Sequence, residues 1–90
     1  MKEIPNVKFT ETDTTVSLLK IALSSPPKEG LDFTMIRSRL KVSDAIENVE
    51  EGGIIKLEDA DHTAAIEAIK AVRWITPAKH LKKFAEQFGL

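Results

Sequence analysis

The chain has 90 residues, which suits one small domain and leaves no room for a second. Its 42% hydrophobic and 30% charged residues exclude a disordered polymer, and the absence of cysteine excludes disulfide bonds, thiol catalysis and cysteine-ligated zinc. A net charge of -1 argues against a surface that binds nucleic acid throughout, and no apolar run approaches the length of a membrane span. We therefore expect a single domain over residues 1–90, without a signal peptide, located in the cytoplasm.

A short strand is predicted directly after Pro5, where apolar Val7 and Phe9 alternate with polar residues. A second strand is predicted at residues 54–57, whose sequence Ile-Ile-Lys-Leu follows two glycines. We expect these two segments to pair and so to connect the N-terminus to the middle of the chain. Because two strands alone are only marginally stable, helices must cover this ribbon.

The first helix is predicted over residues 14–24, with Thr12 or Asp13 as its N-cap. Its apolar positions recur at helical spacing and form one face: Val16, Leu19, Ala22 and Leu23. The segment Ser24-Ser25-Pro26-Pro27 ends the helix, because consecutive prolines cannot continue it and the residue before a proline is pushed toward an extended conformation.

The second helix is predicted over residues 32–50, with Asp32 as its N-cap. Its apolar positions fall into two successive groups: Phe33, Ile36 and Leu40, and then Val42, Ala45, Ile46 and Val49. Because the apolar pattern starts again at Val42, two helices with a bend near Lys41 to Ser43 are an alternative. Asp44 and Glu47 then have the spacing of a capping box at the start of the second of these helices. Gly52 and Gly53 end this region, as glycines commonly do at a helix C-terminus.

The third helix is predicted over residues 60–74, with Asp59 or Asp61 as its N-cap. One face of this helix is apolar and consists of Ala65, Ile66, Ile69 and Val72. Trp74, the single tryptophan, follows this face only loosely. It can be part of the core or a partly exposed anchor for a protein partner.

The fourth helix is predicted to begin at Thr76 and Pro77, a threonine N-cap followed by proline at the first helical position. The helix has the best periodicity in the chain, with an apolar stripe formed by Leu81, Phe84, Ala85 and Phe88. Gly89 follows as a C-terminal cap. Together the segments predict an α+β fold that is mostly helical, with about four helices packed around a minor two-stranded element.

Residues 58–62 place three carboxylates and an imidazole close together in the sequence Glu-Asp-Ala-Asp-His. Such a group can bind a hard cation, and His62 can act as a base, but the segment lacks the ligand series of a calcium-binding loop. We expect these residues to cap the third helix instead. His80, among lysines, is expected to face solvent. No nucleophile or phosphate-loop motif is present, so we predict a protein that is not an enzyme and has no cofactor, metal or small-molecule substrate.

Charge is distributed unevenly along the chain. The middle of the chain is acidic, with Asp44, Glu47, Glu50, Glu51, Glu58, Asp59, Asp61 and Glu67. The C-terminal part has five cations before the next carboxylate: Lys70, Arg73, Lys79, Lys82 and Lys83. Opposed patches of this kind suit head-to-tail self-association, although they are often only two solvated faces.

The predicted partner-binding residues are these five cations and the tryptophan: Lys70, Arg73, Trp74, Lys79, Lys82 and Lys83. Two helices with a tight connection superficially suggest a helix-turn-helix. Lysines contact phosphate well but carry little base-specific information, so sequence-specific DNA recognition is disfavoured. We predict a non-catalytic protein-binding or assembly module that forms homo-oligomers or docks on a larger protein, with no membrane contact. A small regulator that binds nucleic acid through the basic patch is the alternative.

The order of these segments resembles that of small proteins encoded in the morphogenesis regions of tailed phages and prophages. The resemblance covers residues 14–88, and its matching stretches are Val16–Leu23, Met35–Lys41, Ile54–Asp59 and Trp74–Pro77. It is a pattern without an invariant catalytic signature. It implies a phage-derived, non-enzymatic assembly or accessory role, with association with the virion as one possible location, and it assigns no function to a single residue.

Overall fold

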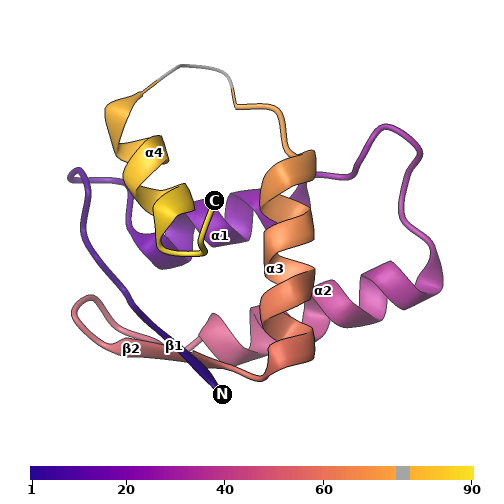
Figure 1. Cartoon of the computed structure of the whole chain (residues 1–90), viewed down its shortest axis with the longest axis horizontal. Coiled ribbons are helices and arrows are strands. Elements are labelled where there is room, and N and C mark those ends of the chain that lie inside the picture. Colours follow the sequence, from indigo (N-terminus) through magenta and orange to yellow (C-terminus); the bar gives the residue numbers. More distant parts are fainter. Residues whose placement is uncertain (75–77) are drawn as a thin grey trace.

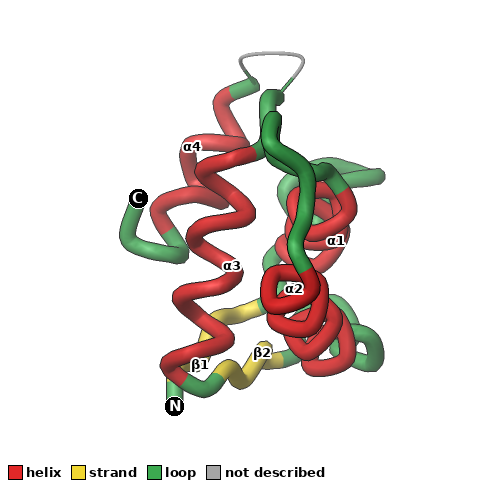
Figure 2. The backbone as a smooth tube through the Cα atoms, turned by 90° about the vertical axis from the view of Figure 1, so that its right-hand side faces the viewer, coloured by secondary structure: helices red, strands yellow, loops and turns green. Residues whose placement is uncertain are grey.

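A computed structural model describes residues 1–74 and 78–90, and it places helices around a short antiparallel ribbon (Figure 1). In chain order the elements are β1 (Lys2–Pro5), α1 (Thr15–Ser24), α2 (Phe33–Ile46), β2 (Ile54–Leu57), α3 (Asp59–Ala71) and α4 (Lys79–Glu86). Figure 2 shows α3 and α4 on one side, α1 and α2 on the other, and the strands at one end. The predicted fold class, α+β and mostly helical, is confirmed for the described residues.

The first strand lies earlier in the chain than predicted. β1 pairs with β2 through Lys2 to Pro5, so the predicted strand at Val7 and Phe9 is wrong, although pairing of the N-terminus with residues 54–57 is confirmed. Pro5 is the last residue of β1 and lies opposite Ile54. Ile4 supplies the buried side chain of β1, whereas Val7 is 39% exposed.

Asn6 connects the end of β1 to two other parts of the chain. Its backbone exchanges hydrogen bonds with the turn before β2, donating to the carbonyl of Gly53 at 2.9 Å and accepting from Gly52 at 3.0 Å. Its side-chain amide donates to the carbonyl of Glu50 at 3.0 Å, and its Oδ1 accepts from the N–H of Val16 in α1 at 3.1 Å. The side chain is buried and fully used, so this residue fixes the start of α1 against the ribbon.

The N-cap of α1 is Thr14, one residue beyond the predicted candidates Thr12 and Asp13. Thr14 and Ser17 form a reciprocal capping box, in which each backbone N–H donates to the other side chain, at 2.7 and 3.1 Å. Ser24 is the last helical residue, as the prolines that follow predict. Asp13 instead contacts α4, as described below.

α2 is one continuous helix, with Asp32 as its N-cap; the Asp32 carboxylate accepts from the N–H of Met35 at 2.8 Å. The alternative of a bend near residues 41–43 is therefore excluded. The helix ends at Ile46, four residues before the predicted end, and the chain turns through Gly52, whose φ of +83° suits glycine. The buried positions of α2 are Arg39, Val42 and Ile46.

Arg39 is a charged residue in the core and was not singled out from the sequence. Its side chain is 5% exposed, and Nη1 donates to the carbonyls of Ala22, Leu23 and Ser25 at 3.2, 3.2 and 2.7 Å. These carbonyls lie at the C-terminal end of α1, where a cation is favourable, and the Ala22 carbonyl also accepts from the N–H of Ser25 at 3.3 Å. Burial lowers the pKa of Arg39, but a guanidinium stays charged at neutral pH.

α3 begins earlier than predicted, and its caps differ. Glu58 is the N-cap and makes no side-chain capping bond, so the prediction of Asp59 or Asp61 in that role is wrong. Both aspartates instead lie in the first helical turn, where carboxylates complement the positive end of the helix dipole. The helix ends at Ala71, three residues before the predicted end.

α4 closes the core from the C-terminal side. Phe84 and Phe88 are buried with their rings 5.5 Å apart, and Leu81 is partly buried, so the predicted apolar stripe is confirmed. The helix begins at Lys79 after Ala78; the predicted start at Thr76 and Pro77 lies outside the described residues. At the C-terminus Gly89 has a φ of +80°, which ends the helix as predicted.

None of the described helices is long and apolar enough to cross a membrane.

Replacement of Arg39 tests the capping of α1. We expect Arg39→Met to lower the free energy of unfolding by about 2–4 kcal/mol, because the carbonyls at the end of α1 lose the three hydrogen bonds that the guanidinium donates. Arg37→Met is the matched control: Arg37 lies on the same helix but is exposed, so a change within about 0.5 kcal/mol is expected. Urea denaturation monitored by circular dichroism measures both. Equal losses in the two variants would contradict this role of Arg39.

Candidate protein-binding surfaces

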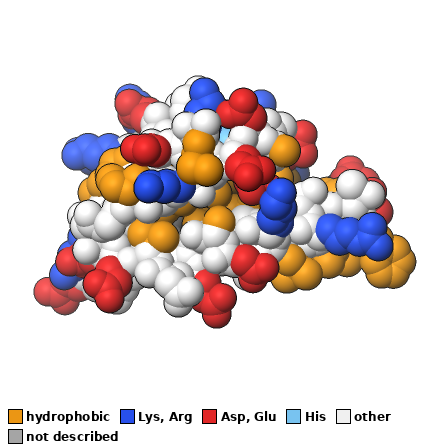
Figure 3. All heavy atoms as spheres, turned by 90° about the horizontal axis from the view of Figure 1, so that it is seen from below, with side chains coloured by type: hydrophobic (Ala, Val, Ile, Leu, Met, Phe, Trp, Pro, Cys, Tyr) orange, Lys and Arg blue, Asp and Glu red, His pale blue; other side chains and the backbone are white. Residues whose placement is uncertain are grey.

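The outward face of α2 carries an apolar stripe. We call Phe33, Ile36 and Leu40 the α2 outer stripe; Phe33 is 79% and Leu40 58% exposed. The stripe points away from the core because Arg39, Val42 and Ile46 fix the opposite face inward. Figure 3, a view from below, shows apolar side chains gathered at the right-hand end of the molecule, where α2 begins. Ile36 is half-buried, so Phe33 and Leu40 are the exposed members of the stripe. Large apolar side chains exposed on one helix face are typical of an interaction surface.

Charged side chains accompany the stripe and change sign along α2. Arg37 is exposed beside the stripe, and Asp44 and Glu47 are exposed on the same side of the helix toward its C-terminus. Lys41 is turned toward α3, where its Nζ lies 3.7 Å from the Asp61 carboxylate. The outward face therefore runs from apolar and basic at its N-terminal end to acidic at its C-terminal end.

The predicted cations of α4 lie on its outer side. Lys79, Lys82 and Lys83 are exposed, while the aromatic residues of the helix face the core. Glu86 lies three residues after Lys83 and four after Lys82, so a carboxylate shares this side of the helix. The basic patch is thus less uniform than the run of lysines suggested.

The other predicted partner-binding residues follow the end of α3. Lys70 and Arg73 are exposed, and Figure 1 shows the end of α3 and the beginning of α4 at the same end of the molecule. Trp74 is partly buried and packs edge-to-face on Phe84, with ring centroids 6.0 Å apart. Trp74 is therefore attached to the core and only partly available. That these residues bind a partner stays a prediction.

Two carboxylates of the acidic segment at the start of α3 pair with one lysine of α2. Asp61 is buried and faces Lys41, and Glu58 lies 3.8 Å from the same ammonium group. His62 turns to the other side and stacks on Phe88, with ring centroids 5.8 Å apart. In the described part of the chain no three His, Asp or Glu side chains converge as metal ligands.

The lysine neighbours of His80 predict that it faces solvent, but its side chain is mostly covered. Its Nε2 lies 2.9 Å from the Asp13 carboxylate, and its ring stacks on Phe9 with centroids 6.1 Å apart. Only 22% of the side chain is exposed. This contact connects α4 to the loop before α1, a pairing of distant residues that helical periodicity cannot reveal.

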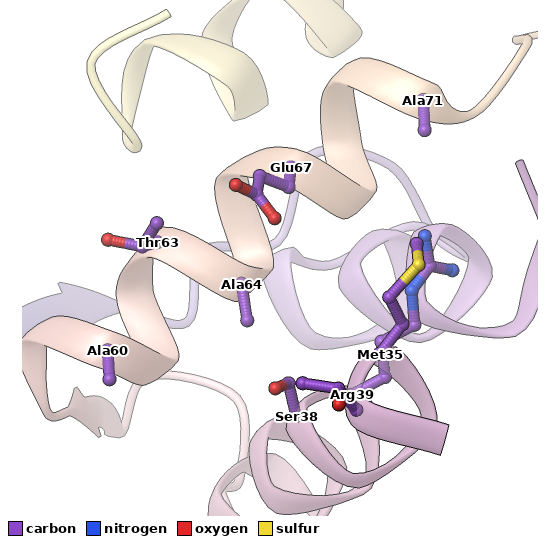
Figure 4. A pocket seen from close by; sticks show the side chains of 9 residues that line it. Met35, Ser38, Arg39, Ala60, Thr63, Ala64, Glu67 and Ala71 are labelled. Carbon is purple, nitrogen blue, oxygen red and sulfur yellow. The ribbon is translucent and has the colours of Figure 1, made fainter. Parts of the chain in front are cut away.

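A groove of about 380 Å³ lies between the N-terminal half of α2 and α3 (Figure 4). Small residues of α3, among them Ala60 and Ala64, form one wall, and Met35 of α2 contributes to the other. The two charged residues at the groove are Arg39, which is bound to carbonyls of α1, and Glu67.

No known protein family, curated protein or solved structure matches the chain.

The stability of the domain is expected to fall at mildly acidic pH through His62. Burial, and secondarily the charge of Lys2, lowers the pKa of His62 below its ordinary 6.5, against a smaller opposite effect of Asp59. Between the lowered pKa of His62 in the folded chain and its ordinary pKa in the unfolded chain, the unfolded chain binds more protons than the folded one. The free energy of unfolding therefore decreases as the pH falls through about 6.5 and below.

Thermal denaturation of the wild type and His62→Gln between pH 8 and pH 5 measures this effect. The difference in melting temperature between the two should shift in favour of the variant as the pH falls, because glutamine stays neutral. Thr63→Ala, at an exposed neighbouring position, should keep the wild-type pH dependence. A difference that is constant with pH would show that protonation of His62 does not oppose folding.

Proposed function

We propose that this protein is a non-catalytic protein-binding module that assembles with itself or with a larger protein through the α2 outer stripe. The exposure of Phe33 and Leu40 on one helix face carries the proposal. Burying such side chains at an interface yields on the order of 1.5–3 kcal/mol each, before the cost of association. The groups that the core requires lie on the other face of α2, so the stripe is free to contact a partner.

The resemblance to proteins of phage morphogenesis regions implies an assembly role of the same kind. We propose a phage or prophage origin and a cytoplasmic or virion-associated location on that basis. Both stay predictions.

A double substitution in the stripe tests the proposed function. We expect Phe33→Glu with Leu40→Glu to abolish binding of protein to the immobilised chain, because a charge replaces each apolar contact, while the circular dichroism spectrum stays unchanged. Lys82→Glu with Lys83→Glu is the matched control, since it also places two exposed glutamates on a helix. Bound proteins are identified by mass spectrometry. If the Phe33→Glu, Leu40→Glu variant still binds protein and the Lys82→Glu, Lys83→Glu variant does not, the binding site lies on α4 and not on the α2 outer stripe.

A nucleic-acid-binding regulator is the second candidate function, and the exposure of all five predicted cations favours it. Contacts of lysine and arginine with phosphate imply an affinity that falls steeply with salt and depends little on sequence. A gel-shift series at low salt with duplex and single-stranded probes tests this function, with the Lys82→Glu and Lys83→Glu variant as the control. Absence of any shift in the wild type would exclude it.

A further inference from the structure

The charges beside the α2 outer stripe are self-complementary. Arg37 lies three residues before Leu40, and Asp44 lies four residues after it, on the same outward face of the helix. Both side chains are exposed, and among the described residues neither forms an ion pair within the chain. A helix surface with a central apolar residue and opposite charges on its two sides matches a copy of itself that runs in the opposite direction.

We propose that the occupant of the α2 outer stripe is a second copy of this chain, paired antiparallel about a twofold axis near Leu40. This inference rests on the proposed function and names its partner. In this pairing the two Leu40 side chains meet, and Arg37 of each copy lies beside Asp44 of the other. Phe33 of each copy then covers the aliphatic stem of Glu47 in the other.

The parallel arrangement is disfavoured by the same residues. It would place Arg37 beside Arg37 and Asp44 beside Asp44, and it would align the two helix dipoles unfavourably. Antiparallel pairing opposes the dipoles and forms two equivalent ion pairs.

The size of the interface predicts a weak, reversible dimer. α2 has 14 residues and is therefore about 21 Å long, so one helix pair buries less area than a standard stable complex. The dissociation constant is expected on the order of 100 μM. Assembly would then depend on local concentration, or on several copies held together by a larger structure.

Sedimentation equilibrium of the full chain between about 10 μM and 1 mM tests the pairing. The wild type should dimerise, and Arg37→Glu or Asp44→Arg alone should weaken the dimer about tenfold, because each brings like charges together twice. The double variant Arg37→Glu with Asp44→Arg should recover most of the affinity. Lys20 borders the same surface hollow as Asp44, so the unfolding midpoint of each variant is measured to confirm that the monomer is intact.

Three outcomes would overturn the proposal. A dimer whose affinity is unchanged in Arg37→Glu and in Asp44→Arg would show that these two residues do not face each other, as in a parallel pair, where each substitution only exchanges one pair of like charges for another. A dimer unaffected by Phe33→Glu with Leu40→Glu would place the interface elsewhere. A wild type that stays monomeric at 1 mM would exclude self-pairing. If the stripe variant nevertheless loses a protein partner that the wild type binds, the proposed function stands. If the wild type binds no protein at all, the self-pairing and the proposed function both fail.

Discussion

The hydrogen bonds of the Arg39 guanidinium to the end of α1 decide the orientation of α2. Three carbonyls at the end of α1 converge on this one group, and rotation of α2 about its axis would remove this donor and leave a buried charge unpaired. Val42 and Ile46 follow Arg39 at helical spacing and are buried with it. The reverse face of α2 must therefore point to solvent, and that face carries the α2 outer stripe.

Much of the architecture follows from local signals in the sequence. The prolines after Ser25, the Asp32 cap and the aromatic spacing in α4 predict helices close to those observed, because each acts through neighbouring backbone or a single face. The position of β1 could not be predicted in this way. Asn6 bonds to residues more than forty positions away, and such contacts decide where the strand ends and α1 begins.

The candidate surface was harder to predict than the fold. Periodicity groups Phe33, Ile36 and Leu40 on one face, but it does not say whether that face meets the core. An arginine ordinarily indicates solvent, so nothing in the sequence marks Arg39 as a core residue. In the structure Arg39 is buried against the carbonyls at the end of α1, and this turns the apolar face of α2 outward. The C-terminal cations were correctly expected on the surface, because lysines on α4 lie opposite buried phenylalanines.

The orientation of α2 can be measured directly, because the chain contains no cysteine. Single cysteines introduced as Leu40→Cys and Val42→Cys are treated with a thiol reagent at a protein concentration of a few micromolar, where a weak dimer is dissociated. The account predicts rapid reaction at position 40 and reaction at position 42 that is slower by about a hundredfold or more, limited by opening of the fold. Rapid reaction at position 42 with protection at position 40 would contradict it, because α2 would then turn its apolar stripe inward.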